Sequence, residues 1–390
     1  MNITTVDIAV IGLGAVGAAT LYQLSKHGKK ILGVDQFAPP HELGSTHGET
    51  RISRLAVGEG FDFIPLVQRS HEIWQEIQQA TDEKLFYQIG GILMDSGNQA
   101  WAKHGSEGFF ERTVNFARRA DIPYEVFDNK ELKKRFREFN LEDTGQVYFE
   151  PSAGYVVPEL AVASQLSLAT KQGAAIKTHT KVLGLKPISG GGVIIETNQG
   201  VIEAGQVSIS VGAWVKDFVP AFYRSHFKIC RQVLHWLPIK PGYFKNTTCP
   251  VYMWGFGPNA EDFIYGFPSL DGVSVKMASE SFIASHHADT IQRSVSEEEK
   301  ENFLSKKLTG KFNGIDPSIL RSKTCLYTVT PDSNFVVDRL PDFPEVLVSS
   351  ACSGHGFKHS AGLGEAIANN LLGIDSMLSI KAFHWPSIDF

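Results

Sequence analysis

The first 35 residues combine an apolar run, a glycine-rich turn, a helical stretch and a second apolar run. Residues Val6 to Ile11 are apolar and rich in β-branched side chains, which predicts a buried strand. The chain then passes through Gly12, Gly14 and Gly17. The stretch from Ala15 to about His27 is rich in Ala and Leu, and Lys30 to Val34 is a second apolar run that ends at Asp35. This order predicts a strand–helix–strand unit with parallel strands.

The same periodicities predict further helices and strands along the chain. Apolar positions at helical spacing predict helices over Pro65–Ala80, Pro158–Gln172 and His359–Leu372. Short apolar runs predict strands at Leu85–Met94 (a pair divided at Gly90-Gly91), at Val193–Thr197 and Val201–Ala204 (a hairpin), at Val207–Val211 and at Glu345–Ser350. Alternation of apolar and polar residues across Phe227–Phe282 predicts an antiparallel sheet.

A strand, a glycine turn and a helix therefore occur at both ends of the chain, with antiparallel material between them. We expect an α/β (mixed α+β) protein with a Rossmann-like dinucleotide domain that is discontinuous in sequence and a second, antiparallel-sheet domain. The predicted ranges are 1–88, 143–220 and 325–390 for the dinucleotide domain, and 89–142 and 221–324 for the substrate domain.

Each glycine of the opening turn has a physical role in dinucleotide binding. Gly12 permits the tight turn, Gly14 lets a pyrophosphate approach the backbone, and Gly17 lets the helix pack closely on the strand. The helix N-terminus offers unpaired N–H groups to phosphate, and Asp35 can accept hydrogen bonds from a ribose diol. The alternative is a packed glycine turn without a ligand. The fingerprint alone does not separate NAD from FAD.

Composition and charge exclude several classes of protein. The 390 residues are 43% hydrophobic and 20% charged, which excludes a disordered chain. The net charge of −5 is a poor match for a nucleic-acid binder. No apolar run is long enough to span a membrane, and the N-terminus lacks the basic region of a signal peptide. The cysteines, at positions 230, 249, 325 and 352, form no CxxC pair and no zinc pattern, so we expect a reduced, cytoplasmic protein without a metal.

Four blocks of sequence resemble the monomeric sarcosine oxidase and N-methyltryptophan oxidase family. The blocks are Gly44 to Arg54 with Gly58-Glu59-Gly60, Tyr265 to Pro268 with Lys276, Cys325 to Thr328 with Asp338, and Ser353 to Lys358. They occur in family order and extend over most of the chain. The resemblance implies covalently bound FAD and oxidation of a secondary amino acid by O₂.

The resemblance also implies a role for individual residues. Arg54 and Lys358 would bind the substrate carboxylate, for which arginine and lysine are suited by their charge-assisted hydrogen bonds. Lys276 would activate oxygen, with Arg51 as a second basic residue beside the flavin. Cys325 would form the thioether to FAD. Tyr265 and Tyr327 would bracket the substrate, and His47 is a further catalytic candidate. The cofactor-binding set would be completed by Ser45, Val182, Gly354, His355, Gly356 and Phe357, the last three at a helix N-terminus directed at the flavin.

Every one of these residues also has an ordinary structural interpretation. Arg54 and Lys358 could form surface ion pairs, and Lys276 could be a solvent-facing strand lysine. Cys325 could be a buried inert cysteine, and the two tyrosines could be core residues.

The chain departs from the family pattern at Glu280, where relatives usually carry a histidine four residues after the lysine. An acid in the pocket favours a substrate with a cationic or polyhydroxy part, and this spacing is similar to that of the fungal deglycating oxidases. Thr46 also replaces a second histidine found in relatives. Sarcosine is therefore the first expected substrate, and a larger N-methyl, cyclic imino or glycated amino acid is the alternative.

Three hypotheses assign the chain to another class of protein. They are an NAD-dependent dehydrogenase, a flavin dehydrogenase that reduces a membrane quinone, and a nucleotide sensor without catalysis. The quinone enzyme would be expected to carry a basic amphipathic helix, and the sequence shows none. The sensor would leave the four cations near the site without a shared role. The expected partners are a small amino acid and O₂, with no nucleic acid and no membrane, and the expected oligomeric state is a monomer.

Overall fold

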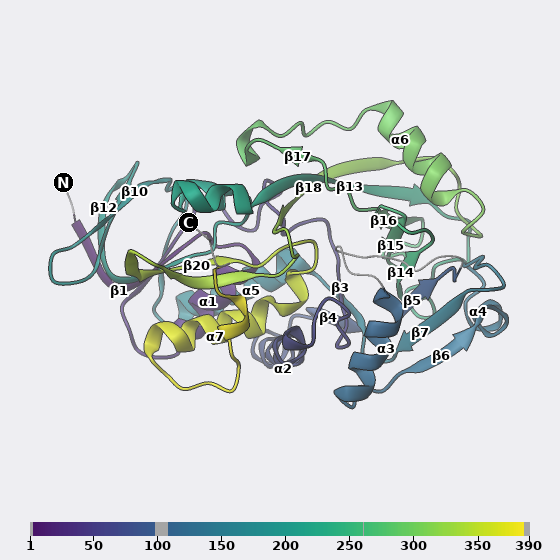
Figure 1. The fold of residues 1–390 in the computed structure, drawn as a ribbon, viewed down its shortest axis with the longest axis horizontal. Helices are drawn as coiled ribbons and strands as arrows, with labels where there is room; N and C mark the ends of the chain where they lie inside the picture. Colours follow the sequence, from purple (N-terminus) through teal and green to yellow (C-terminus); the bar gives the residue numbers. More distant parts are fainter. Residues whose placement is uncertain (1–2, 98–107, 260, 386–390) are drawn as a thin grey trace.

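The computed structural model describes residues 3–97, 108–259 and 261–385. The predicted domain ranges thus extend beyond the described residues at 1–2, 98–107, 260 and 386–390. Two large sheets lie side by side along the long axis of the molecule (Figure 1). A third, three-stranded sheet has the order β3-β8-β4, formed by β3 (Arg51–Ser53), β4 (Phe86–Gln88) and β8 (Gly154–Val156).

The eight-stranded sheet has a parallel centre. Its order is β10-β11-β12-β1-β2-β9, with β20 paired to β12 and β19 paired to β20. Strands β12, β1, β2, β9 and β20 pair in parallel, whereas β10, β11 and β19 add antiparallel hairpins. The strands are β1 (Ile3–Ile11), β2 (Ile31–Val34), β9 (Ala175–Lys177), β10 (Val182–Pro187), β11 (Val193–Thr197), β12 (Gly200–Ile209), β19 (Val336–Leu340) and β20 (Phe343–Ser350).

Helices cover one face of this sheet, and the central strand is buried on both faces. Helix α1 (Ala15–Ser25) packs against α5 (Pro158–Lys171) and α7 (Ser360–Leu372), and α2 (Ile64–Thr81) packs against α7. Ile8 and Val10 of β1 belong to the core under these helices, whereas Ala9 and Ile11 belong to the core on the opposite face. An apolar run without alternation is typical of such a doubly covered parallel strand. The strand–helix–strand unit expected at the N-terminus is confirmed.

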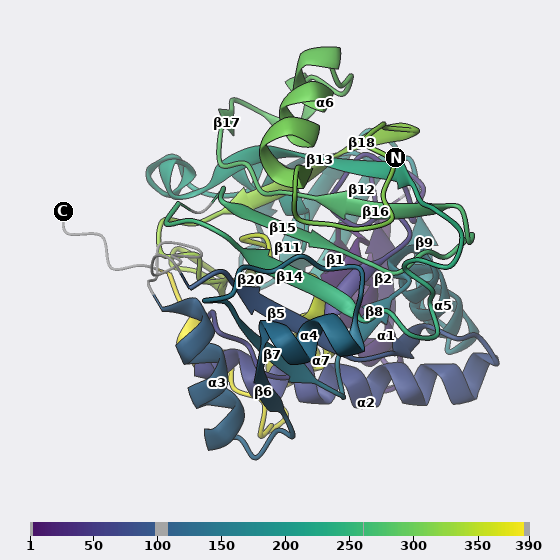
Figure 2. The ribbon, with the colours of Figure 1, turned by 90° about the vertical axis from the view of Figure 1, so that its right-hand side faces the viewer.

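The nine-stranded sheet is mainly antiparallel, as the pattern across 227–282 predicts. Its order is β17-β13-β16-β15-β14-β5-β7-β6, with β18 paired to β13, and only β5 and β14 run parallel. Helices α3 (Phe109–Arg119), α4 (Asn129–Arg135) and α6 (Glu297–Phe303) lie on this side of the molecule (Figure 2). The strands are β5 (Gly91–Asp95), β6 (Glu125–Asp128), β7 (Gln146–Glu150), β13 (Lys228–Pro238), β14 (Val251–Gly255), β15 (Phe263–Gly266), β16 (Ser274–Ala278), β17 (Ala284–Ser285) and β18 (Arg321–Val329).

Two predicted strand assignments differ from the structure. The segment 85–94 is not a strand pair: β4 and β5 enter different sheets, because the chain turns at Gly90 with φ +81°. The segments 201–204 and 207–211 are not separate strands either, since β12 continues through Gly205. A Cβ at Gly205 would lie 2.9 Å from the Asp7 carbonyl oxygen, which explains a glycine inside a strand.

Strand β18 joins the two halves of the molecule. It pairs with β13 along its length, and its end contacts the turn after β20: the Ser353 N–H donates to the Thr328 carbonyl at 2.8 Å. Strands β7 and β18 both belong to the nine-stranded sheet, where β7 pairs with β5 and β6 and β18 pairs with β13. Residues 146–150 and 325–329 nevertheless fall in ranges expected for the dinucleotide domain. The domain boundaries stay a prediction, because sheet pairing alone does not define a boundary. Among the described residues, no helix combines the length and apolarity needed to cross a bilayer.

The opening turn generates a stability prediction. A Cβ on Gly17 would lie 1.8 Å from the Gly12 carbonyl oxygen, whereas a Cβ on Gly14 would meet only the Thr46 Oγ1, at 3.7 Å. We expect Gly17→Ala to lower the free energy of unfolding by about 1–3 kcal/mol, because the helix must move off the strand. Gly14→Ala is the matched control, with a loss under about 1 kcal/mol. Denaturant unfolding followed by circular dichroism measures both, and equal losses would contradict this packing role.

Candidate active site

One cavity of about 720 Å³ is lined by residues from both large sheets. Most of the site residues expected from the sequence lie on its wall. They are Gly12, Gly14, Asp35, Ser45, Arg51, Arg54, Val182, Tyr265, Glu280, Cys325, Tyr327, Gly354, His355, Gly356, Phe357 and Lys358. The three expected residues outside the lining are Gly17, His47 and Lys276, of which Gly17 lies at the contact between helix and strand.

The parallel strands end on one side of this cavity with a preorganised glycine turn. Gly12 has φ +84°, and the Asp35 carboxylate accepts hydrogen bonds from the Leu13 and Phe37 N–H groups, each at 2.8 Å. Asp35 therefore holds the turn itself, in addition to the ribose contact expected of it. Helix α1 begins directly after the turn, so its first N–H groups have no partner within the helix.

Buried hydroxyl groups next to this turn indicate that the cavity takes a polar ligand. Ser210, Ser349 and Ser350 line the cavity, and their hydroxyl oxygens are buried without a hydrogen-bond partner among the described residues. Buried polar groups are normally paired, so these donors match the oxygens of a bound group. The helix N-terminus, the open side of Gly14 and the hydroxyls fit the pyrophosphate and ribityl chain of FAD.

The turn after β20 forms a second rigid wall. Gly354 has φ +82°, and a Cβ on Gly356 would lie 1.8 Å from the Ala351 carbonyl oxygen. His355 Nε2 lies 2.9 Å from the Ser333 carbonyl oxygen, and its ring stacks on Phe335 at 4.9 Å. A 3-10 turn over Phe357–His359 continues directly into α7. The N–H groups at its start are free of intrahelical bonds, which suits an anionic edge of a ligand.

Two cations that are far apart in the sequence share one buried carboxylate. Arg54 donates to Glu59 Oε2 at 2.9 Å, and the Lys358 Nζ lies 3.5 Å from Glu59 Oε1. All three side chains are at most 6% exposed, and all three line the cavity. The group carries one net positive charge when each member is ionised. Such a site attracts one further anion. Arg54 already donates from Nη1 to the Ala56 carbonyl and from Nη2 to Glu59, and a guanidinium has five N–H donors in all, so further donors remain for a carboxylate.

Glu59 has no functional role in the sequence interpretation, although it stands in the Gly58-Glu59-Gly60 block. The contact with Lys358 joins residues 299 positions apart, which no local pattern indicates. The sequence did contain one indication of a role for Glu59, since this acid stands between Gly58 and Gly60, shortly after Arg54.

The Cys325 thiol lies beside a guanidinium. Arg51 Nη2 is 3.5 Å from Cys325 Sγ and donates to the Ser45 carbonyl at 2.7 Å, while Nη1 donates to the Thr50 carbonyl at 2.8 Å. The thiol itself lies 3.5 Å from the Ser45 carbonyl oxygen. The sulfur atom therefore lies against a fixed positive charge and points to the Ser45 carbonyl. Cys352 also lines the cavity, but burial raises the pKa of its thiol.

Lys276 points to the loop that precedes Arg51. Its Nζ donates to the Gly48 and Thr50 carbonyls at 2.6 and 2.7 Å, and lies 4.2 Å from the Phe267 ring centroid. On the other side of the loop, Glu159 Oε1 accepts from the Gly48 N–H at 2.6 Å. The loop segment 48–50 is thus held from two sides. The Lys276 ammonium group binds its carbonyls, and the Glu159 carboxylate binds its N–H groups.

The charged groups around Lys276 shift its pKa in opposite directions. Burial, and then the positive charge of Arg51, lower the pKa of Lys276 well below its usual value, whereas the carboxylates of Glu159 and Glu49 oppose this shift. Glu159 was missed in the sequence analysis, because a single acid in the first turn of a helix ordinarily indicates only a favourable helix dipole.

His47 lies in the same loop and is fully enclosed. Its ring is 1% exposed, and neither ring nitrogen has a hydrogen-bond partner among the described residues. Burial, aided by the charge of Arg51, lowers the pKa of His47 to about 3. The ring is therefore neutral at physiological pH.

Two tyrosines and an acid form a further part of the cavity wall. Tyr265 and Tyr327 line it, and Glu280 is only 6% exposed beside them. Burial raises the pKa of both tyrosines well above the usual range, and the negative charge of Glu280 raises them further. This part of the wall combines apolar surface with hydroxyl and carboxylate groups, whereas the group of Arg54, Glu59 and Lys358 supplies positive charge. Within the described ranges, no three His, Cys, Asp or Glu side chains form a metal-binding group.

Structures that share the fold come from several oxidases and dehydrogenases. NikD, described as an unusual amino acid oxidase essential for nikkomycin biosynthesis, matches with a TM-score of 0.84 at 19% identity, covering 98% of this chain and 97% of that chain. Amadoriase I from Aspergillus fumigatus, a fructosyl amine:oxygen oxidoreductase, matches with a TM-score of 0.75 at 17% identity, covering 99% and 90%. At these identities the comparison shows the fold alone.

Sequence relatives are closer. Monomeric sarcosine oxidase of Streptomyces avermitilis is 32% identical over 370 residues, covering 94% of this chain and 93% of that protein. N-methyl-L-tryptophan oxidase of Yersinia pestis (strain Pestoides F) is 30% identical over 383 residues, covering 97% and 98%. Residues 7–370 match the family described as FAD dependent oxidoreductase, which decides between the NAD and FAD alternatives. The chain is therefore an FAD-dependent oxidoreductase that belongs to the family of monomeric sarcosine oxidase and N-methyl-L-tryptophan oxidase.

Proposed function

We propose that this protein oxidises the secondary amine of an N-methylated amino acid such as sarcosine with O₂. The imine formed hydrolyses to an amine and an aldehyde, and O₂ becomes H₂O₂. The observation that carries this proposal is the convergence of Arg54 and Lys358 on the cavity wall that also holds Cys325 and the two tyrosines. A carboxylate anchor beside the expected flavin site is what oxidation of an amino acid requires.

When bound, FAD accepts a hydride equivalent from the carbon next to the substrate nitrogen and passes the electrons to O₂. The protein groups supply binding and orientation. Arg54 and Lys358 hold the substrate carboxylate, for which the net positive charge of the Arg54–Glu59–Lys358 group leaves capacity. Tyr265 and Tyr327 flank the amine end, and the start of the 3-10 turn at Phe357 directs its N–H groups to the anionic edge of the cofactor.

The acid at position 280 supports a second candidate substrate class. Glu280 is buried beside the tyrosines, and the only group of a small substrate such as sarcosine that could meet its carboxylate is the amine. A larger N-methyl amino acid with a cationic side chain, or a glycated amino acid with hydroxyl groups, would pair with this carboxylate. The name of Amadoriase I, a fructosyl amine oxidoreductase with this fold, is consistent with that class.

We also propose that FAD is held through a thioether to Cys325 and that the protein is a cytoplasmic monomer. The Arg51 guanidinium at the thiol supports the attachment. All four cysteines are free, which is compatible with a reducing compartment. The curated relative with 32% identity is itself named a monomeric enzyme.

Peroxide release tests the proposed reaction. The purified protein is expected to consume O₂ and release H₂O₂ with at least one member of a panel of sarcosine, Nα-methyl-L-lysine, N-methyl-L-tryptophan, L-proline and fructosyl-glycine. The corresponding primary amino acids glycine and lysine serve as controls. No peroxide with any panel member would overturn the proposal, and peroxide with fructosyl-glycine alone would select the glycated class.

Flavin attachment gives a second prediction. Cys325→Ser is expected to leave the flavin absorbance near ~450 nm in the supernatant after acid precipitation, because an alcohol does not provide the thiolate nucleophile. In the wild-type protein the yellow colour should stay with the pellet. Cys352→Ser is the matched control, since Cys352 lines the same cavity with a raised thiol pKa. Loss of attachment in Cys352→Ser and its retention in Cys325→Ser would assign the bond to the other cysteine.

Lys276 gives a prediction with a defined pH dependence. A lysine with a lowered pKa loses its proton as pH rises through that pKa, so its positive charge is present only below it. The rate of reoxidation of the reduced enzyme by O₂ is therefore expected to fall with rising pH, at a pH below the ordinary lysine value. Lys276→Met should slow reoxidation at least tenfold, leave flavin reduction by substrate within about threefold, and abolish the pH transition. Stopped-flow absorbance measures both steps.

Glu159→Gln is the companion variant. Its carboxylate raises the pKa of Lys276, so removing the charge should move the reoxidation transition to lower pH. Equal slowing of both half-reactions in Lys276→Met would remove Lys276 from the oxygen role.

A further inference from the structure

The strand that pairs with the Cys325 strand carries a buried glutamine. Gln232 lies on β13 directly opposite Cys325 of β18, and both side chains line the cavity. Opposed residues in an antiparallel pair have Cβ atoms about 4.5–5.5 Å apart. Gln232 is only 1% exposed, so its amide must be paired within the protein.

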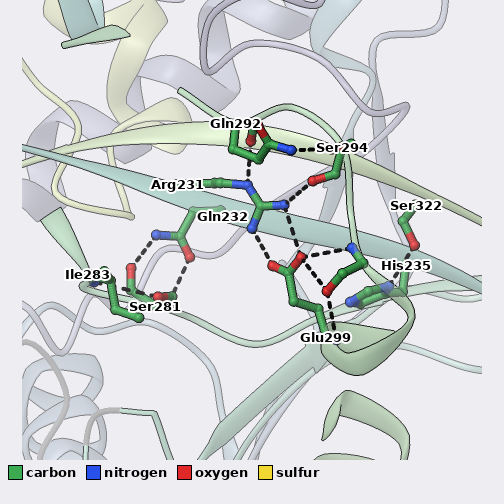
Figure 3. Close-up of polar contacts among 10 residues, drawn as sticks. Arg231, Gln232, His235, Ser281, Ile283, Gln292, Ser294, Glu299 and Ser322 are labelled. Carbon is green, nitrogen blue, oxygen red and sulfur yellow. Dashed lines mark hydrogen bonds and ion pairs between the residues drawn. The ribbon is translucent and has the colours of Figure 1, made fainter. Parts of the chain in front are cut away.

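The partner of this amide is the backbone immediately after Glu280. Gln232 Nε2 donates to the Ser281 carbonyl at 2.5 Å, and the Ser281 N–H donates to Gln232 Oε1 at 2.8 Å (Figure 3). Both polar ends of one side chain thus bind both polar groups of one residue. This two-point contact fixes the position and the orientation of that backbone, and with it the adjacent Glu280.

The neighbouring residue of the same strand holds the far end of the same segment. Arg231 donates to the Gln292 carbonyl at 2.6 Å, to the Ser294 carbonyl at 2.7 Å and to Glu299 at 2.5 Å (Figure 3). The segment 281–294 is therefore anchored on β13 at its start by Gln232, in its middle by the short ladder of β17, and at its end by Arg231. Arg231 does not line the cavity, so it provides a matched control for Gln232.

A carboxylate at the end of a pocket selects substrates only when it stays in one place. Glu280 is at the end of β16, which stops at Ala278, so the strand ladder no longer holds it. It lines the same cavity as Tyr265 and Tyr327 and is only 6% exposed. Of the contacts that tie the following segment to β13, the pair with Gln232 lies next to Glu280 and opposite Cys325, whereas the ladder between β17 and β13 begins only at Ala284.

We infer that Gln232 is a positioning residue for substrate specificity, which holds Glu280 at a fixed place relative to Cys325 so that its carboxylate can bind a cationic or hydroxyl-bearing substrate side chain. This inference rests on the proposed function, because it needs an N-alkyl amino acid in the cavity. It assigns no contact with the substrate to Gln232 itself.

A double-mutant cycle tests it, with sarcosine and Nα-methyl-L-lysine as probes. The measured quantity is the ratio of kcat/KM for Nα-methyl-L-lysine to that for sarcosine. Glu280→Gln is expected to lower this ratio at least tenfold, mainly through KM. Gln232→Met, which keeps the length of the side chain but makes no hydrogen bonds, should lower it five- to tenfold. The double variant should be no lower than Glu280→Gln alone, because Gln232 acts only through Glu280.

Three further measurements separate positioning from general damage. Arg231→Gln should leave the ratio within about twofold of wild type, although it loosens the same segment. Gln232→Asn, one methylene shorter, should give an intermediate ratio, and it replaces Gln232→Met if that variant does not fold. The fraction of flavin retained by acid-precipitated protein should stay unchanged in all three variants.

The outcomes distinguish this inference from the proposed function. Wild-type protein that oxidises neither probe nor any other panel member overturns both. Wild-type protein that oxidises the probes, with a Gln232→Met ratio equal to wild type, overturns only the inference. The same follows if Gln232→Met lowers the ratio further in the Glu280→Gln background, or if Arg231→Gln lowers it as much.

Discussion

The loop between β2 and β3 is held in place by two opposite charges that bind the same peptide groups. Lys276 takes the carbonyls of Gly48 and Thr50, and Glu159 takes the N–H groups on the other side. One of these residues belongs to the nine-stranded sheet and the other to a helix of the eight-stranded half. The loop therefore joins the two halves of the molecule. Arg51, and with it the environment of the Cys325 thiol, depends on this contact.

Buried carboxylates partly neutralise the buried cations around the cavity. Glu59 lies between Arg54 and Lys358, and Glu159 lies near Lys276 and Arg51. Buried cations without such partners would be costly, and cations fully neutralised by them would not attract an anionic ligand. The Arg54–Glu59–Lys358 group therefore keeps one net positive charge, which suits the carboxylate of the proposed substrate.

The sequence indicates those parts of the fold that depend on local patterns. The N-terminal strand–helix–strand unit is readable because Gly12, Gly14 and Gly17 fall between an apolar run and a helix, and the structure confirms it. The routing of β4 and β5 into separate sheets is not readable, since both are short apolar runs and their partners lie far along the chain.

The site shows the same division. Residues within motif blocks, such as Arg54 and Lys358, could be named in advance, and the cavity brings them together. Glu59, Glu159 and Gln232 act through contacts with residues that are 49 to 299 positions away in the chain. Glu159 and Gln232 are ordinary residue types for a helix start and a strand, so no spacing or composition could single them out. Glu59 does stand between two glycines in a motif block, but its contact with Lys358 depends on tertiary packing. The position of Lys276 against loop carbonyls likewise depends on tertiary packing.

Cys325 and Tyr327 are two residues apart on β18, so their side chains face the same side of the sheet about 7 Å from each other. A change of substrate that shifts or twists this strand would therefore also move Cys325, the residue that we propose to carry the flavin. Substitutions that change substrate specificity are therefore expected at cavity positions that lie on other segments of the chain. Position 280 lies beyond the end of β16, outside the strand ladder, so a substitution there changes the cavity wall without moving β18.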